Sequence, residues 1–139
     1  MFAFLLTKEM VPLNEEIIMR HLNFIVHKRG KSYEKERCIF HGNSEKQLHK
    51  FPQTKLEKIV YSLVQLQHGM KASLKTKPLH GLGDGVMEFV QNGKPAYRCV
   101  YVVLDDVIHV LHAFVKTSDG TDSKHENTIK ERYKNIKKG

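Results

Sequence analysis

Two basic side chains fall inside a segment that is otherwise typical of buried β-strands. Between Gly81 and Lys116 the sequence predicts three short strands, and Arg98 and Lys116 occupy positions where buried strands normally carry apolar residues. A cation held in a partly desolvated pocket is unfavourable unless an anion, such as a phosphate, regularly lies against it. These two residues therefore predict a site for an anionic ligand on the sheet.

The whole chain is basic, and further cations precede this segment. Lys and Arg number 23 against 15 Asp and Glu, which gives a formal net charge of +8. The segment KASLKTKPLHGLGDG, which we expect to form a loop, carries Lys71, Lys75 and Lys77 and no acid before Asp84. Such a charge attracts polyanions, and ribosomes, RNA and DNA are the commonest in cells. Many small proteins are basic merely for solubility, so charge alone does not decide the matter.

Other classes of site find no support in the sequence. Cys38 and Cys99 are too few for a disulfide framework and fit a reducing cytoplasm. We find no HxH, CxxC or clustered-carboxylate pattern, so we expect neither a metal nor a cofactor. The opening run MFAFLL has only six apolar residues, too few for a membrane span, and lacks the features of a signal peptide. We therefore expect a cytoplasmic protein with no membrane partner.

The elements ahead of the lysine-rich segment are predicted to be mainly helical. A helix around Glu15–His21 and a strand over Leu22–Lys28 are expected first, the strand leading by a hairpin or an extended linker to the run CIFHG. A short helix follows in NSEKQLHKF. A second helix starts near Pro52, carries apolar residues at helical spacing and stops at Gly69. We expect this helical pair to cover one face of a sheet.

The second half of the chain predicts the sheet itself and its other cover. Strands are expected over Val86–Gln91, Ala96–Val103 and Val107–Lys116, and connections of hairpin length make them antiparallel neighbours. The last two strands are apolar at nearly every position, which indicates cover on both faces. A carboxyl-terminal helix, with a capping box at Ser123 and Glu126, supplies the second cover. These elements together predict an α+β fold in one domain.

Four segments occur in the order and spacing of one toxin family: PQTKLEKIVYSLVQLQHG, KPLHGLGDGVMEF, AYRCVYVV and IHVLHAFVK. The chain resembles the phage-derived HigB-like toxins of the RelE/ParE superfamily, from type II toxin–antitoxin systems, over residues 39 to 136. Residues 39–139 would then form the toxin domain, and residues 1–38 an amino-terminal extension with a possible strand. The resemblance implies a RelE-like fold, in which a small antiparallel sheet has a helical hairpin on one side and a carboxyl-terminal helix near the other.

The resemblance also implies an activity. Members of this family resemble ribosome-dependent mRNA endonucleases, or mRNA interferases, which a cognate helix-turn-helix, HigA-like antitoxin neutralises. The partners implied are that antitoxin, the ribosome and mRNA. Cleaving RNA through its own 2′-hydroxyl requires removal of that proton, stabilisation of the phosphorane and protonation of the departing 5′-oxygen, and none of these steps requires a metal.

The site residues follow from matching the family's motifs. Arg98, in the YR pair, would hold the scissile phosphate, and Lys116, after HAF, would stabilise charge or move a proton. Lys77, with Lys75 and Lys71 in the same loop, would position RNA. Tyr97 neighbours Arg98 and is a candidate RNA contact, although it projects to the opposite face, where core packing is the alternative. Each cation also has a structural alternative. Arg98 could form only an ion pair with Glu88, Lys116 could lie in solvent at the end of its strand, and the loop lysines could be merely solvated.

Two further residues are candidates for proton transfer. Glu88 could act as the base or orient Arg98, or could form only a structural salt bridge. His112 shares strand parity with Lys116 and could transfer a proton or stack on a nucleobase, or could be a hydrogen-bonded core histidine. His109 has the opposite parity, so we expect the two histidines not to face the same site.

Two departures from the family keep other functions open. Many relatives carry an arginine shortly after the strand glutamate and a second lysine after HAF, whereas this chain has Val90 and Thr117. The scaffold also serves gyrase poisons of the ParE type, which cleave nothing themselves, because fold alone does not fix function. A gyrase-inhibiting toxin and an inactive relative that only binds antitoxin are therefore the alternatives.

Overall fold

The computed structural model describes residues 37–117 and 123–138, which form a mixed sheet between two helical layers. The strands are β1 (Arg37–Phe40), β2 (Lys75–Pro78), β3 (Met87–Gln91), β4 (Ala96–Leu104) and β5 (Val107–Lys116), in the order β1-β5-β4-β3-β2. All neighbouring pairs are antiparallel except β1 and β5, which are parallel. The helix and strand predicted between residues 15 and 28, and nearly all of the proposed extension, lie outside the described residues.

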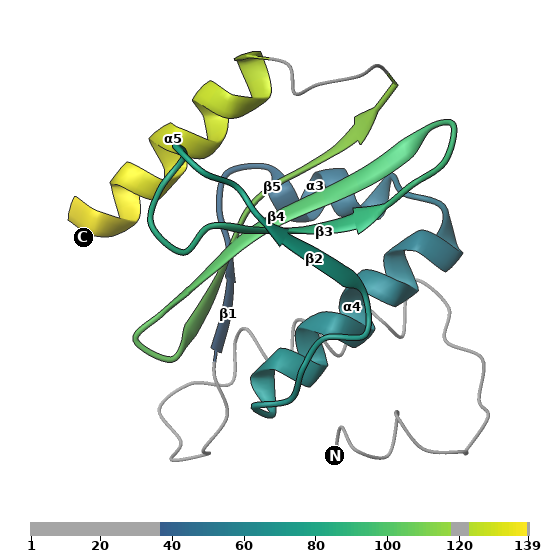
Figure 1. Cartoon of the computed structure of the whole chain (residues 1–139), viewed down its shortest axis with the longest axis horizontal. Helices are drawn as coiled ribbons and strands as arrows, with labels where there is room; N and C mark the ends of the chain where they lie inside the picture. The colour runs from purple at the N-terminus through teal and green to yellow at the C-terminus, as the bar shows by residue number, and fades with distance from the viewer. Residues whose placement is uncertain (1–36, 118–122, 139) are drawn as a thin grey trace.

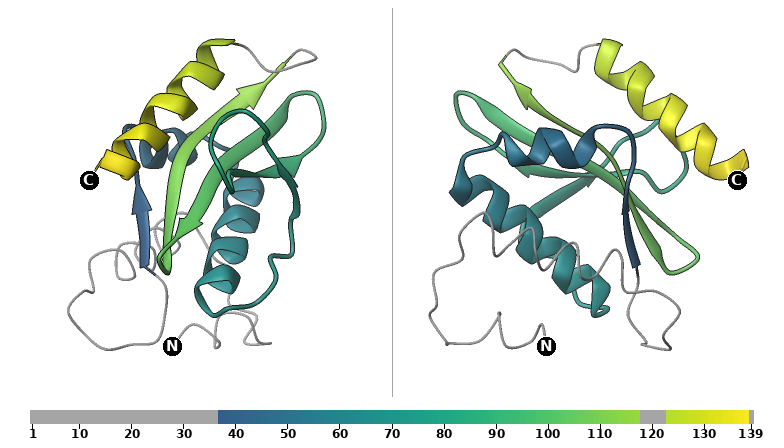
Figure 2. Two further views of the ribbon diagram at one scale, coloured as in Figure 1. Left: turned by 60° about the vertical axis from the view of Figure 1, so that its left-hand side comes forward. Right: turned by 180° about the vertical axis from the view of Figure 1, so that it is seen from behind.

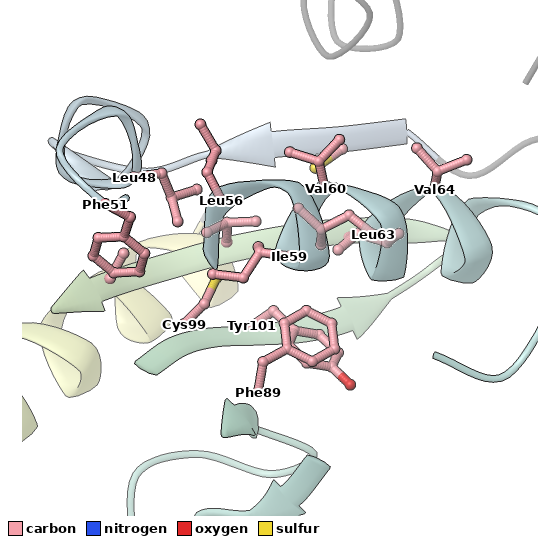
Figure 3. Close-up of a cluster of buried hydrophobic side chains, with 14 residues drawn as sticks. Leu48, Phe51, Leu56, Ile59, Val60, Leu63, Val64, Phe89, Cys99 and Tyr101 are labelled. Atoms are coloured by element: carbon pink, nitrogen blue, oxygen red, sulfur yellow. The ribbon is translucent and has the colours of Figure 1, made fainter. Parts of the chain in front are cut away.

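Two helices cover one face of the sheet, as the sequence predicts. They are α3 (Ser44–His49) and α4 (Gln53–Gln67), and α4 begins directly after Pro52. Gly69 follows its end with φ +73°, a left-handed conformation that glycine adopts without strain. Figure 3 shows the apolar side chains of α3 and α4 packed against side chains of β3 and β4; the labelled residues are Leu48, Phe51, Leu56, Ile59, Val60, Leu63, Val64, Phe89, Cys99 and Tyr101.

A third helix, α5 (Ser123–Lys138), covers the opposite face. Alternate residues of a strand point to opposite faces, and those of β4 divide between two cores: Cys99 packs with α4, whereas Val100 packs with Ile129 and Tyr133 of α5. Figures 1 and 2 show α5 in yellow on one side of the sheet, with α3 and α4 in blue and teal on the other. The expected α+β fold with both faces covered is confirmed.

The structure corrects the predicted sheet in two places. Residues Lys75–Pro78 form strand β2, where the sequence had indicated only a loop, and β1 adds a parallel strand at the other edge. β2 is an edge strand whose side chains are mostly exposed, so lysines are tolerated there and no apolar alternation marks it. The three strands predicted from the apolar runs agree with β3, β4 and β5 to within one residue at each end.

A β-bulge in β5 overturns the parity argument for the histidines. Val100 pairs with His112, but Val102 pairs with His109, so β5 contributes one extra residue between these pairs. Val100 and Val102 both pack against α5, and their cross-strand partners project to the same face. The two histidines therefore both lie on the α5 side, which the sequence argument had excluded.

Candidate functional site

Side chains from four strands meet on the face of the sheet that α5 partly covers. One cross-strand row runs Lys77, Glu88, Val100, His112, and the next runs Lys75, Val90, Arg98, Phe114; Lys116 lies beyond, opposite Ala96. Cross-strand partners share a face. The structure thus brings six of the predicted residues to one surface: Lys75, Lys77, Glu88, Arg98, His112 and Lys116.

Arg98 is buried, with 6% of its surface exposed, and its guanidinium is anchored to the β3–β4 turn. Nη1 donates to the carbonyl oxygens of Tyr97 at 3.1 Å and Gln91 at 3.4 Å, and Nη2 donates to Oδ1 of Asn92 at 3.1 Å. Nε lies 3.7 Å from Oε1 of Glu88, an ion pair longer than a hydrogen bond. A guanidinium has five N–H donors. Three of them are used, and Nε faces the Glu88 carboxyl, so one donor, on Nη2, is left for an external anion.

Glu88 is the buried carboxyl at the centre of this surface, with 2% of its surface exposed. Burial raises its pKa above the usual value, while the positive charges of Arg98, Lys77 and Lys116 act in the opposite direction. Three cations from three strands therefore act on one carboxyl. A raised pKa makes Glu88 a stronger proton acceptor than an exposed glutamate.

The remaining predicted cations lie at the rim. Lys75 and Lys77 are exposed on β2, Lys116 is half-buried at the end of β5, and Lys71 is exposed in the connection before β2. Lys71 is not part of the cross-strand rows. The ammonium groups of Lys75 and Lys77 are open to a polyanion approaching this face.

Tyr97 lies apart from the other candidates. Its ring packs against Phe51 on the α4 side of the sheet, with centroids 4.9 Å apart, and Nζ of Lys55 lies 5.8 Å from the ring centroid. The structure thus places Tyr97 on the face opposite Arg98, in the surroundings that favour core packing.

His112 is a buried histidine held by two partners from α5. Its Nε2 lies 2.9 Å from Nδ1 of His125, and its Nδ1 lies 3.5 Å from Nη1 of Arg132. Burial, reinforced by His125 and Arg132, lowers the pKa of His112 to about 4. The imidazole is therefore neutral near pH 7, which agrees with the core-histidine alternative and disfavours proton donation by this residue.

Asn92, His125 and Arg132 were not among the site residues predicted from the sequence. Asn92 is a turn residue next to strand β3, and its contact with Arg98 follows from the hairpin. His125 and Arg132 share a face of α5 with no motif around them, so only the packing of α5 on β5 reveals their contacts. A cavity of about 310 Å³ is also lined by residues outside the prediction: His41, Gly42, Thr128, Glu131, Arg132 and Asn135.

The cysteines, possible metal ligands and helix hydropathy of the described residues point to no other kind of site. Cys38 and Cys99 are free and fully buried, and burial raises the pKa of both thiols, that of Cys99 to about 12, so they are unreactive. Over residues 37–117 and 123–138 we find no group of three or more His, Cys, Asp or Glu placed to hold a metal ion. None of the described helices is both long and apolar enough to cross a membrane.

The comparisons with known proteins address the family directly. The family model described as "Phage derived protein Gp49-like (DUF891)" matches residues 46–134. No curated protein matches the chain. A chain in the crystal structure of the toxin–antitoxin complex RelBE2 from Mycobacterium tuberculosis is similar, with 20% identity, a TM-score of 0.36, and coverage of 60% of this chain and 94% of that one. A likeness that low adds nothing to the assignment, which rests on the family model. The chain belongs to the phage-derived Gp49-like family, one of the RelE/HigB-type toxin families.

Proposed function

We propose that this toxin cleaves mRNA on the ribosome without a metal ion and that a cognate antitoxin holds it inactive. The observation that carries the proposal is the gathering of Arg98, Lys77 and Lys116 around the buried carboxyl of Glu88 on one face of the sheet. A phosphodiester undergoing attack by its own 2′-hydroxyl needs anion binding and proton transfer at one place. This face offers both.

The phosphate is bound by cations in this proposal. The remaining Nη2 donor of Arg98 binds a nonbridging oxygen, and the guanidinium stabilises the charge that develops on the phosphorane. Because the guanidinium is already anchored by three oxygens of the β3–β4 hairpin, little reorganisation is needed when the substrate arrives. Lys77, Lys75 and Lys71 hold neighbouring phosphates.

Two residues transfer the protons. Glu88, as carboxylate, takes the proton from the 2′-hydroxyl as that oxygen attacks phosphorus. The bond to the 5′-oxygen breaks, and the ammonium of Lys116 donates a proton to it, leaving a 2′,3′-cyclic phosphate and a 5′-hydroxyl. His112 has no proton-transfer role here because its low pKa keeps it neutral.

The partners follow from this function. A cytoplasmic toxin of this kind requires the ribosome and mRNA as its targets, and we expect a HigA-like helix-turn-helix protein as its antitoxin. The net charge of +8 steers the toxin to ribosomal RNA, so cleavage should weaken as ionic strength rises.

The test is cleavage of mRNA on purified translating ribosomes, with new 5′ ends mapped. We expect Lys116→Ala and Arg98→Ala each to lower the rate by at least about 100-fold. Lys116 is the cleaner change because it is half-buried and its side chain makes no hydrogen bond or ion pair with the described residues. Lys55→Ala, which removes one positive charge on the opposite face, is the matched control and should cleave like the wild type.

The outcomes separate the competing functions. Cleavage by Arg98→Ala and Lys116→Ala at the wild-type rate contradicts the proposed site. Intact mRNA together with gyrase-dependent cleavage of DNA would favour a gyrase poison instead.

One observation favours the inactive alternative. Val90 is the cross-strand partner of Arg98, at the place where many relatives carry a second cation. If the wild type leaves both mRNA and DNA intact but binds its antitoxin, an antitoxin-binding relative is the better assignment.

A further inference from the structure

Arg132 is a fixed cation between α5 and the sheet. Its Nη1 donates to the carbonyl oxygen of Leu111 at 2.8 Å and its Nη2 to Oδ1 of Asn43 at 3.0 Å. The guanidinium also lies against Gly42, where an added Cβ would fall 2.4 Å from Cζ. These contacts hold the Nη1 group beside Nδ1 of His112, 3.5 Å away.

This position determines which nitrogen of His112 carries its proton. Arginine has only donors, so Nδ1 of His112, which faces it, is the unprotonated nitrogen. The imidazole is neutral, and its single proton therefore lies on Nε2. The alternative tautomer would point an N–H group at a cation.

The contact between His112 and His125 determines the tautomer of His125 as well. Nε2 of His112 donates to Nδ1 of His125 across 2.9 Å, so Nδ1 of His125 is an acceptor and its own proton lies on Nε2. In the described part of the chain nothing bonds this Nε2.

His125 lies beside the candidate site. Its ring stacks on Phe114, with centroids 4.1 Å apart and planes inclined by 19°. Phe114 is the cross-strand partner of Arg98 and shares its face. Cross-strand side chains lie about 5 Å apart at Cβ, so the half-buried imidazole is one side chain away from the proposed phosphate anchor.

We propose that His125 is a substrate-binding residue whose Nε2–H donates to a phosphate oxygen of the bound RNA. Arg132 and His112 are positioning residues: Arg132 sets the tautomer of His112, and His112 sets that of His125. The proposal rests on the proposed RNA-cleaving function for its ligand, but the tautomer itself does not depend on that function.

The tautomer is measured first, by nitrogen-15 NMR of the imidazoles in the full chain at pH 7.5. We expect the Nε2–H form for both His112 and His125. In Arg132→Gln the constraint on His112 is lost, and His125 should become a mixture of both tautomers. Lys130→Ala, an exposed change on the same helix, should leave the wild-type spectrum. The Nδ1–H form of His125 in the wild type would overturn the inference.

Ribosomal mRNA cleavage then tests the role. His125→Phe keeps a ring on Phe114 but removes the donor, and we expect KM to rise roughly 10- to 100-fold, the worth of one hydrogen bond to a charged group. His125→Gln, which keeps an N–H donor, should recover most of that loss and retain the pH dependence of the wild type. An unchanged KM in His125→Phe would overturn the donor role. So would the loss, in His125→Gln, of one limb of the pH profile of the cleavage rate. If Arg98→Ala also cleaves normally, the proposed function fails instead, whatever the tautomer.

Discussion

Acidification should destabilise the fold through His112, and the size of the effect follows from its burial. Burial, with His125 and Arg132, lowers the pKa of His112 from 6.5 to about 4 in the folded protein. Below pH 6.5 the unfolded chain therefore binds a proton on this residue that the folded protein does not. The stability contributed by neutral His112 is fully present above pH 6.5 and is lost as the pH falls toward 4.

The expected loss can be worked out for a single step from pH 7 to pH 5. With one site whose pKa values are 6.5 unfolded and about 4 folded, linkage gives a decrease of about 2 kcal/mol in the free energy of unfolding. His41, whose pKa burial and Arg132 also lower, adds a change of the same sign. Glu88, whose pKa is raised, acts in the opposite direction.

A comparison of variants isolates His112 from these other groups. Urea unfolding is measured at pH 7 and pH 5 for the wild type, His112→Gln and His80→Gln, the last an exposed histidine that serves as control. The wild type and His80→Gln should lose about 2 kcal/mol more than His112→Gln over this interval. Equal losses in all three proteins would refute the argument that His112 is buried and neutral.

Two further predictions concern glycine positions and the charge balance of the site. Gly42→Ala should lower the free energy of unfolding, measured in urea, by about 2–3 kcal/mol, because alanine at φ +56° is strained and its Cβ meets the guanidinium of Arg132. The control Gly81→Ala, at φ +84° with open space around it, should lower it by only about 1 kcal/mol. Equal losses in the two variants would contradict the close contact at Gly42. Val90→Arg should lower the pKa of Glu88, because nearby cations already oppose the rise in this pKa that burial causes. The pKa is measured by carbon-13 NMR titration of the carboxyl group. An unchanged pKa would show that a charge at residue 90 is too far from Glu88 to affect it.

Much of the architecture could be predicted because it depends on local periodicity. The apolar spacing in α4 and the continuous apolar runs of β4 and β5 identify those elements without tertiary information. β2 could not be found in this way, since an exposed edge strand of lysines has no apolar face to signal it. Alternation along a strand predicts the face on which a side chain lies only where the strand is regular. The bulge beside Leu111 therefore places His109 on the face opposite to the one predicted relative to His112.

Part of the candidate site could also be predicted from the sequence. Arg98, Glu88 and Lys116 could be named because a charge inside a strand is conspicuous in the sequence. The surroundings of His112 could not, because His125 and Arg132 come from a helix whose side of the sheet and register are set by packing alone. The sequence therefore identifies the charged groups, whereas the structure shows which of them are buried and what they face.

The burial of these groups decides how the surface can bind an anion and transfer a proton. Burial acts on both inner groups in the direction of neutrality, raising the pKa of Glu88 and lowering that of His112. The positive charge that remains is carried by the anchored Arg98 and by lysines at the rim, Lys75, Lys77 and Lys116. A polyanion approaching this face therefore meets the lysines at the rim first and the preoriented guanidinium second. The carboxyl that would accept a proton lies beneath them, where the arriving phosphate itself would raise its pKa further and strengthen it as a base.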